Sequence, residues 1–223
     1  ILWLIPIQAM PLMLALAVWT LAPQEALVQR RYWREAHAKL GRLEAKVIGI
    51  TGSFGKTSAK QILSHVLETA STGLATPGSV NTPMGIARIV REQLRPEHSY
   101  FIAEMGAYGI GSIDRLCKLA PPDFAVITAI GKAHYERFKT LETVANAKFE
   151  LAEAAVARGG KVIVTEDVLS HATALAFADR YPNAMIVCGE GETCDLRILA
   201  QSQTKDGLSL SMTWQGEAYE FTV

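Results

Sequence analysis

The feature that most constrains the fold is a glycine-rich loop that joins an apolar strand to a helix at residues 47–58, VIGITGSFGKTS. Gly52 and Gly55 allow positive φ angles and close backbone approach, so that several loop N–H groups can face a phosphate. Lys56 would neutralise the β- and γ-phosphates, and the Thr57 hydroxyl would bind Mg²⁺. The spacing is the compact form GxxGK(S/T), because Ile50 stands where the longer pattern has glycine. The sequence therefore predicts a nucleotide site, with a structural glycine turn as the alternative; the cofactor-binding loop residues are Gly52, Ser53, Phe54, Gly55, Lys56, Thr57 and Ser58.

After residue 46, short apolar runs alternate with helical stretches. This alternation predicts an α/β fold with a doubly wound, mainly parallel sheet, in which ligands bind at the carboxyl ends of the strands. The last segments instead alternate apolar and polar residues between glycine-containing turns, which predicts a terminal antiparallel β meander. The expected strands are 47–51, 100–104, 124–128, 161–165 and 184–188, the expected helices 56–70, 113–119, 141–158 and 168–180, and the meander strands 196–203, 208–214 and 218–223.

The first 22 residues carry no charge and are almost entirely apolar. A helix of that length would cross about 30 Å of hydrocarbon. Trp3 and Trp19 lie near its two ends, and positive charges follow it, so we expect an N-terminal transmembrane helix with the downstream part in the cytoplasm. The alternative is a buried core helix. Because the chain does not begin with methionine, we expect a fragment that further spans can precede.

Residues 23–45 contain many helix formers and a rough apolar stripe bordered by arginine and lysine. This pattern favours a basic juxtamembrane helix close to anionic headgroups. A linker helix packed on the following domain fits the pattern equally well. The stripe consists of Leu27, Tyr32, Trp33, Ala36 and Leu40.

Composition excludes some function classes. Lys and Arg number 22, as do Asp and Glu, which argues against a nucleic-acid partner held by bulk positive charge. The three cysteines, Cys117, Cys188 and Cys194, form no CxxC pair, which favours a reducing compartment over a disulfide framework.

The loop and five later motifs, taken in order, resemble the Mur ligases, and among them most closely the D-alanyl-D-alanine-adding branch. The resemblance covers residues 46–223 and implies the central ATP-binding domain of that family. The family's UDP-binding N-terminal domain would be replaced here by the membrane segment and the basic helix, and its C-terminal ligase domain would begin after residue 223. The later motifs are NTPMG at 81–85, AEMGA at 103–107, PD at 122–123, AH at 133–134 with Phe138, and NAKFE at 146–150.

The resemblance implies an ATP-dependent amide ligase of cell-wall precursor synthesis, located at the bacterial cytoplasmic (inner) membrane. ATP would phosphorylate the carboxylate of a UDP-MurNAc-peptide, and an amine such as D-Ala-D-Ala would displace the phosphate. Two alternatives remain open. One is a ligase of the same fold that acts on a lipid-linked precursor or an amino-acid polymer, and the other is a membrane-anchored, nucleotide-binding scaffold without turnover.

The same resemblance assigns roles outside the loop. Glu104, at the end of an apolar strand, would bind Mg²⁺, with a structural ion pair as the alternative. His134 would be a catalytic and metal-site residue, and Lys148 would be carbamylated and hold a second Mg²⁺ together with its catalytic role. Asn81 and Thr82 would contact the γ-phosphate or the nucleotide-sugar substrate, or else Thr82 would cap a helix that begins at Pro83. The expected metal set is Thr57, Glu104, His134 and Lys148, and the expected catalytic set is Lys56, Lys148 and His134.

Overall fold

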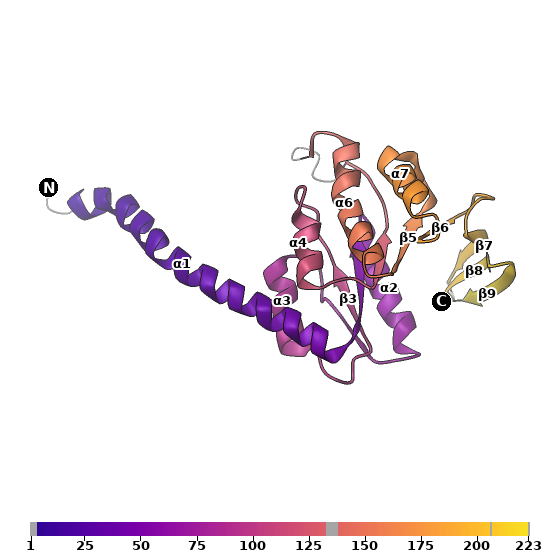
Figure 1. The fold of residues 1–223 in the computed structure, drawn as a ribbon, viewed down its shortest axis with the longest axis horizontal. Helices are drawn as coiled ribbons and strands as arrows, with labels where there is room; N and C mark the ends of the chain where they lie inside the picture. The colour runs from indigo at the N-terminus through magenta and orange to yellow at the C-terminus, as the bar shows by residue number, and fades with distance from the viewer. Residues whose placement is uncertain (1–3, 133–137, 206, 223) are drawn as a thin grey trace.

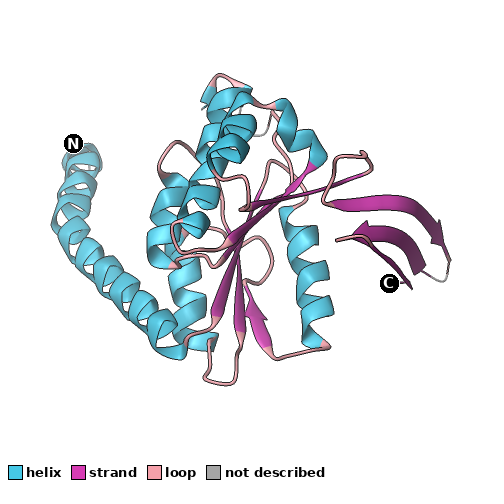
Figure 2. Cartoon of the chain, turned by 45° about the vertical axis from the view of Figure 1, so that its right-hand side comes forward, coloured by secondary structure: helices cyan, strands magenta, loops and turns pink. Residues whose placement is uncertain are grey.

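The computed structural model describes residues 4–132, 138–205 and 207–222. These residues form an α/β fold around one sheet with the strand order β2-β3-β1-β4-β5-β6-β7-β8-β9 (Figures 1 and 2). Pairing is parallel from β2 through β7 and antiparallel from β7 to β9. The predicted mainly parallel sheet with a terminal antiparallel meander is therefore confirmed. The strands are β1 (Lys46–Thr51), β2 (Gly73–Ala75), β3 (Tyr100–Glu104), β4 (Phe124–Ile127), β5 (Lys161–Thr165), β6 (Met185–Gly189), β7 (Leu196–Thr204), β8 (Gly207–Trp214) and β9 (Glu217–Thr222).

The helices cover both faces of the parallel part of the sheet (Figure 2). On one face α2 packs through Ala59, Leu63 and Leu67 against a small core of β1 and β3 side chains. The other face carries the main core, to which α1, α3, α4, α6 and α7 contribute. The helices are α1 (Leu4–Leu43), α2 (Lys56–Glu68), α3 (Pro83–Gln93), α4 (Ser112–Leu119), α6 (Leu141–Val156) and α7 (Ala172–Arg180), with a 3₁₀ helix η1 (Glu166–Ser170).

Strand register brings the loops that matter to one edge of the sheet. In the parallel ladders Ile50 of β1 is level with Glu104 of β3, and Thr51 is level with Ile127 of β4. The segments that follow β1, β3 and β4 therefore meet at the carboxyl edge, where ligands of open α/β sheets bind.

Two local differences from the sequence prediction have clear causes. The short strand β2 was not expected, because it has only three residues, and α3 was expected only as the alternative in which Thr82 caps a helix that begins at Pro83. The single helix expected at 168–180 is divided, since His171 takes an extended conformation (φ −101°, ψ 136°) between η1 and α7.

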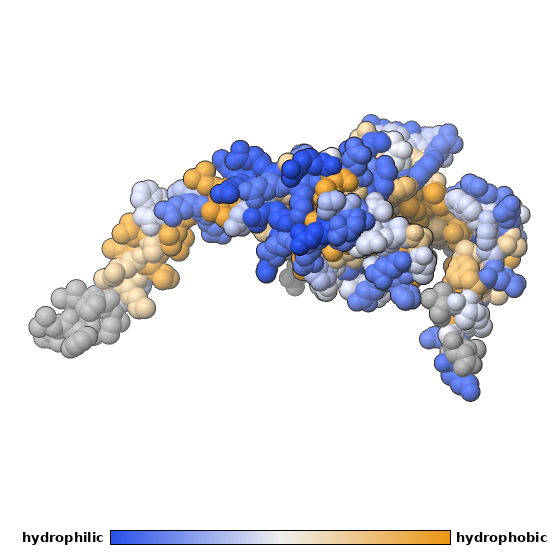
Figure 3. All heavy atoms as spheres, turned by 90° about the horizontal axis from the view of Figure 1, so that it is seen from below, coloured by the Kyte–Doolittle hydropathy of each residue, from blue (hydrophilic) through white to orange (hydrophobic). Residues whose placement is uncertain are grey.

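The N-terminal region is one helix rather than two separate segments. Helix α1 runs through Pro11 and Pro23 without a break and extends away from the domain (Figure 1). Side chains from Met10 to Val28 are exposed, so the buried-core alternative for the apolar segment is wrong. Apolar side chains gather on this extending part (Figure 3). One window of α1 is long and apolar enough to cross a membrane, with a mean hydropathy of 1.4, although a signal sequence would pass the same test.

The C-terminal half of α1 packs on the domain, as the linker-helix alternative predicted. Ala36 and Leu40 are buried in the main core. The Glu35 carboxylate accepts a hydrogen bond from Arg91 of α3 at 2.7 Å, and the Arg91 guanidinium stacks on the Tyr32 ring at 3.7 Å. These contacts fix the direction in which the apolar half of the same helix leaves the domain.

Candidate functional site

The glycine-rich loop is braced by the segment that follows β4. Ser53 N–H donates to the Ala129 carbonyl at 2.9 Å, and the Ser53 hydroxyl donates to the Gly131 carbonyl at 2.9 Å. The Thr128 hydroxyl donates to the Phe54 carbonyl at 2.6 Å. Because the Ser53 N–H and hydroxyl and the Phe54 carbonyl are all bonded from this side, the loop has a defined shape before any ligand binds.

The two loop glycines are required for different reasons. Gly55 has φ +78°, a left-handed conformation that glycine adopts without strain. Gly52 is not among the residues with positive φ, so that part of the sequence argument was wrong for this position. A Cβ on Gly52 would lie 2.0 Å from the Thr128 hydroxyl oxygen, and close packing explains the glycine. Helix α2 begins directly after Gly55, so its positive dipole end faces the loop.

Glu104 is the centre of the polar cluster at the end of β3. Its side chain is only 1% exposed. One carboxylate oxygen, Oε2, accepts hydrogen bonds from the Thr57 hydroxyl at 2.9 Å and from Lys60 Nζ at 3.0 Å. The other oxygen, Oε1, accepts one from Asn81 Nδ2 at 3.2 Å. Burial favours the neutral acid, but the hydrogen bonds from Lys60, Asn81 and Thr57 outweigh it and hold the Glu104 pKa below its usual value.

Lys60 is the site residue that sequence reasoning missed. Its side chain is 2% exposed and also donates to the Gly78 carbonyl. Lys60 therefore joins α2, β3 and the turn after β2 through a single ammonium group. The available signal was its position one helical turn after Lys56, on the side of α2 that faces the sheet. The ion pair that the sequence left as an alternative for Glu104 is present.

Asn81 and Thr82 make different contacts in the structure. Asn81 belongs to the cluster, because its amide bonds Glu104 and its Oδ1 accepts a hydrogen bond from the Tyr108 hydroxyl at 2.7 Å. Thr82 caps α3, accepting from the Gly85 N–H at 3.3 Å with Pro83 in the first turn. The helix-cap alternative is thus confirmed for Thr82.

Lys148 is the second buried cation of the site. It lies on α6 and is 3% exposed. Burial, assisted by the nearby positive charge of Lys56, lowers the pKa of Lys148 to about 7. Within residues 4–132, 138–205 and 207–222, no carboxylate lies at ion-pair distance from its ammonium group. A large fraction of Lys148 is therefore a neutral amine near neutral pH. His134, the remaining predicted site residue, lies outside the described residues.

The donor set suits Mg²⁺ held together with phosphates rather than a metal held by protein alone. The part of the chain that the structure describes has no group of three or more His, Cys, Asp or Glu side chains that could enclose a metal. Thr57 and Glu104 instead present two hard oxygens 2.9 Å apart, directly beside the phosphate loop. Mg²⁺ commonly binds one or two protein oxygens and completes its shell with phosphate and water, so these residues fit the ion. Lys56 Nζ donates to the Gly52 carbonyl at 2.8 Å, within the loop itself.

Comparison with known proteins gives one family. The family model for the Mur ligase middle domain matches residues 50–223. A UDP-N-acetylmuramoyl-tripeptide–D-alanyl-D-alanine ligase from Bacillus subtilis is 32% identical over 173 residues, 77% of this chain and 36% of the relative. The ligase of the same name from Mycobacterium tuberculosis is 39% identical over 121 residues, 54% of this chain and 23% of the relative. The chain thus spans about a third or less of these curated relatives.

Solved structures agree with the sequence matches. MurF ligase from Thermotoga maritima in complex with ADP is similar with a TM-score of 0.72 and 26% identity, covering 87% of this chain and 44% of that chain. MurF from Acinetobacter baumannii gives a TM-score of 0.75 at 24% identity, covering 87% of this chain and 42% of that chain, which supports the fold alone.

The depressed Lys148 pKa predicts that this lysine makes the free energy of unfolding depend on pH. Unfolding returns the amine to a pKa near 10.5, so between pH 7 and 10.5 the unfolded chain binds more protons than the folded chain. In CO₂-free buffer, Lys148→Met should therefore have a larger free energy of unfolding than the wild type near pH 7. The difference should shrink by up to about 1.4 kcal/mol per pH unit as the pH rises towards 10.5.

Urea unfolding at several pH values measures this difference, and Lys132→Met, at an exposed position, is the matched control. A Lys148→Met difference that does not change with pH would contradict the assigned burial cost.

Proposed function

The chain belongs to the Mur ligase family through its ATP-binding middle domain, and from that membership we propose that it is the phosphoryl-transfer domain of an ATP-dependent amide ligase. The observation that carries the proposal is the pair of oxygens from Thr57 and Glu104, 2.9 Å apart, beside a phosphate loop with an available lysine. The ADP bound to the T. maritima relative supports nucleotide binding at this domain.

The protein contribution to the transfer is positioning and charge. The loop N–H groups and the start of α2 hold the phosphate oxygens, and Lys56 turns from the Gly52 carbonyl to the β- and γ-phosphates. Thr57 and Glu104 would hold Mg²⁺, with Lys60 and Asn81 fixing the carboxylate in place. The chemistry that Mg²⁺ supplies when bound there is neutralisation of charge on the phosphates.

The reaction has two steps. A carboxylate oxygen of the acceptor attacks the γ-phosphorus of ATP, the bond to ADP breaks, and an acyl phosphate forms. The amine nitrogen then attacks the acyl carbon, inorganic phosphate leaves, and the amine gives up a proton. By analogy with the names of its relatives, the acceptor is a UDP-MurNAc-tripeptide and the amine is D-Ala-D-Ala, in cell-wall precursor synthesis. A lipid-linked precursor is the second candidate acceptor, favoured by the exposed apolar half of α1.

Lys148 is assigned a catalytic role as a carbamate. A neutral amine is the form that adds to CO₂, and the addition releases one proton and leaves one negative charge. The low Lys148 pKa and the lack of a carboxylate partner among the described side chains support this chemistry. The carbamate oxygens would serve a second Mg²⁺, and His134 is proposed to complete the catalytic and metal-binding set.

The apolar half of α1 is proposed to anchor the protein in the bacterial cytoplasmic membrane, with the catalytic domain in the cytoplasm. Its exposure and the six basic residues from Arg30 to Lys46 that follow the apolar segment support this orientation.

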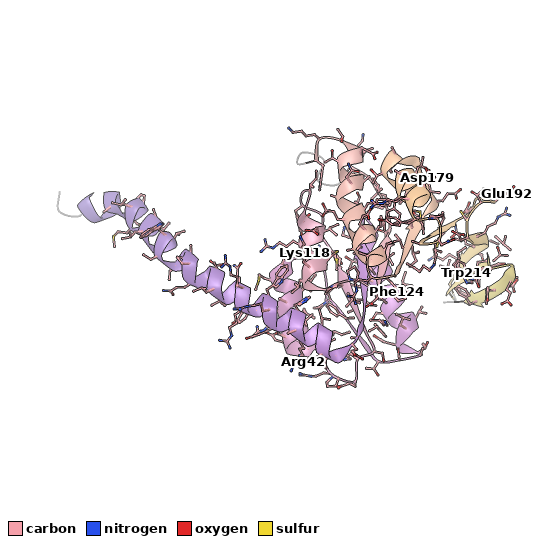
Figure 4. All side chains as sticks on the ribbon, in the orientation of Figure 1. Arg42, Lys118, Phe124, Asp179, Glu192 and Trp214 are labelled. Atoms are coloured by element: carbon pink, nitrogen blue, oxygen red, sulfur yellow. The ribbon has the colours of Figure 1, made fainter. Side chains whose placement is uncertain are left out.

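ATP binding tests the proposal at Lys56. Lys56→Ala should weaken binding of a non-hydrolysable ATP analogue with Mg²⁺ by about tenfold or more, because a charge-assisted hydrogen bond to phosphate is lost. Isothermal titration calorimetry measures the effect, and Lys118→Ala, an exposed lysine of α4 (Figure 4), is the control. Equal affinity of wild type and Lys56→Ala would refute the site. Binding without phosphoryl transfer in the full-length protein would favour the scaffold alternative.

Membrane anchoring has a separate test. The wild-type chain should stay with membranes after alkaline carbonate extraction, since the apolar helix is held by hydrocarbon and not by charge. Leu14→Arg combined with Leu16→Arg should release the protein, because each arginine costs about 3 kcal/mol in the bilayer centre. Both leucines are exposed in the fold, so the change leaves the domain intact. Release of the wild type by carbonate would refute the anchor.

A further inference from the structure

A groove of about 690 Å³ lies where α1 crosses α3 and α4. Leu27 and Trp33 of α1 and Met84 of α3 form its apolar walls. The groove is separate from the phosphate loop, and none of the residues assigned above to the site lines it.

The charged groups of this groove are all positive. Arg30 and Arg34 of α1 and Arg115 of α4 line it, and no lining residue is acidic. None of the three forms an ion pair with any carboxylate that the structure describes. The Arg115 guanidinium lies over the Trp33 ring at 5.6 Å, which holds it at the groove.

Neighbouring arginines behave differently. Arg31 bonds the Glu35 carboxylate at 2.7 Å within α1, and Arg91 of α3 bonds the same carboxylate at 2.7 Å and joins α1 to the domain. The groove therefore collects three guanidinium groups that the fold does not neutralise. Guanidinium groups beside an apolar wall are complementary to a phosphate-bearing amphiphile.

The residues that line the groove lie close in the chain to both the apolar half of α1 and the phosphate site. Arg30 follows Trp19 by eleven residues on one continuous helix, a rise of about 16 Å. At the other end, Met84 is three residues from Asn81, so that their Cα atoms are at most about 11 Å apart. Asn81 in turn bonds Glu104 at 3.2 Å. A molecule with its tail along α1 and its phosphates in the groove can direct its polar end towards the phosphate loop.

We propose that this groove binds the diphosphate of a lipid-linked acceptor, whose hydrocarbon chain follows the exposed face of α1 and whose carboxylate reaches the γ-phosphate of ATP. The proposal rests on the proposed ligase function and names its substrate class. Three guanidinium groups without a described carboxylate partner match the two or more negative charges of a diphosphate, and the apolar wall residues Leu27 and Trp33 belong to the helix whose first half is apolar and exposed. A nucleotide diphosphate shares the charged part of this chemistry but not the apolar part.

Farnesyl diphosphate is the probe, and its equilibrium binding to the full chain in detergent is the measurement. It should bind at least about tenfold more tightly than inorganic diphosphate, farnesol or uridine diphosphate, since only the probe uses both parts of the groove. Arg34→Gln and Arg115→Gln should each weaken its binding by about tenfold. Arg42→Gln, a matched change near the C-terminal end of the same helix (Figure 4), should leave it unchanged.

The outcomes separate the two proposals. Binding of the ATP analogue with Mg²⁺ is measured on the same samples and should be equal in the wild type and in all groove variants. A wild type that does not bind the analogue would overturn the ligase proposal. Farnesyl diphosphate binding that is unchanged by Arg34→Gln and by Arg115→Gln would overturn the proposal that the groove is its site. Equal affinity for uridine diphosphate, with the same arginine dependence, would assign the groove to a nucleotide and overturn the lipid-linked acceptor.

Discussion

The arrangement of the site depends on one buried ion pair, between Lys60 of α2 and Glu104 of β3, 3.0 Å apart. Burying both charges is costly, and the cost is offset only because Thr57, Asn81 and the Gly78 carbonyl supply the remaining hydrogen bonds. Those bonds join the helix after the phosphate loop, the buried strand β3 and the turn before α3. The same contacts leave a carboxylate oxygen beside the Thr57 hydroxyl, where phosphate-bound Mg²⁺ finds hard donors. The cluster around Lys60 and Glu104 therefore both stabilises the fold and supplies the oxygens of the candidate site.

Much of this could be predicted from local pattern. A strand, a glycine-rich turn and a lysine at a helix start specify the loop, and alternation of apolar runs specifies the parallel sheet and its meander. The predictions that failed concern residues whose roles depend on contacts with residues far away in the sequence. Gly52 is required by the Thr128 side chain 76 positions later, and the position of Lys60 is explained by Glu104, 44 positions later. A lysine in a helix is by default read as exposed, and the position of Lys60 one turn after Lys56 does not reveal the carboxylate with which it pairs.

Helix α1 shows the same limit on a larger scale. Its sequence favours a membrane span followed by a basic helix, but composition cannot show that the two form one continuous helix or that Glu35 and Tyr32 contact Arg91. That attachment also creates the groove, because it sets Arg30 and Arg34 opposite Arg115. The contacts of Glu35 and Tyr32 with Arg91 tie α1 to the helix that begins beside Asn81, and the proposed lipid-linked acceptor depends on this arrangement.

We propose that Glu104 and Thr57 bind the Mg²⁺ that accompanies ATP. The most direct test of this proposal is the Mg²⁺ dependence of ATP-analogue binding to Glu104→Gln, an isosteric change that removes the charge. The affinity gained on adding Mg²⁺ should fall by about tenfold or more, with little loss of Mg²⁺-independent affinity, while Glu153→Gln, at an exposed position on α6, should match the wild type. An undiminished gain from Mg²⁺ in Glu104→Gln would contradict the account.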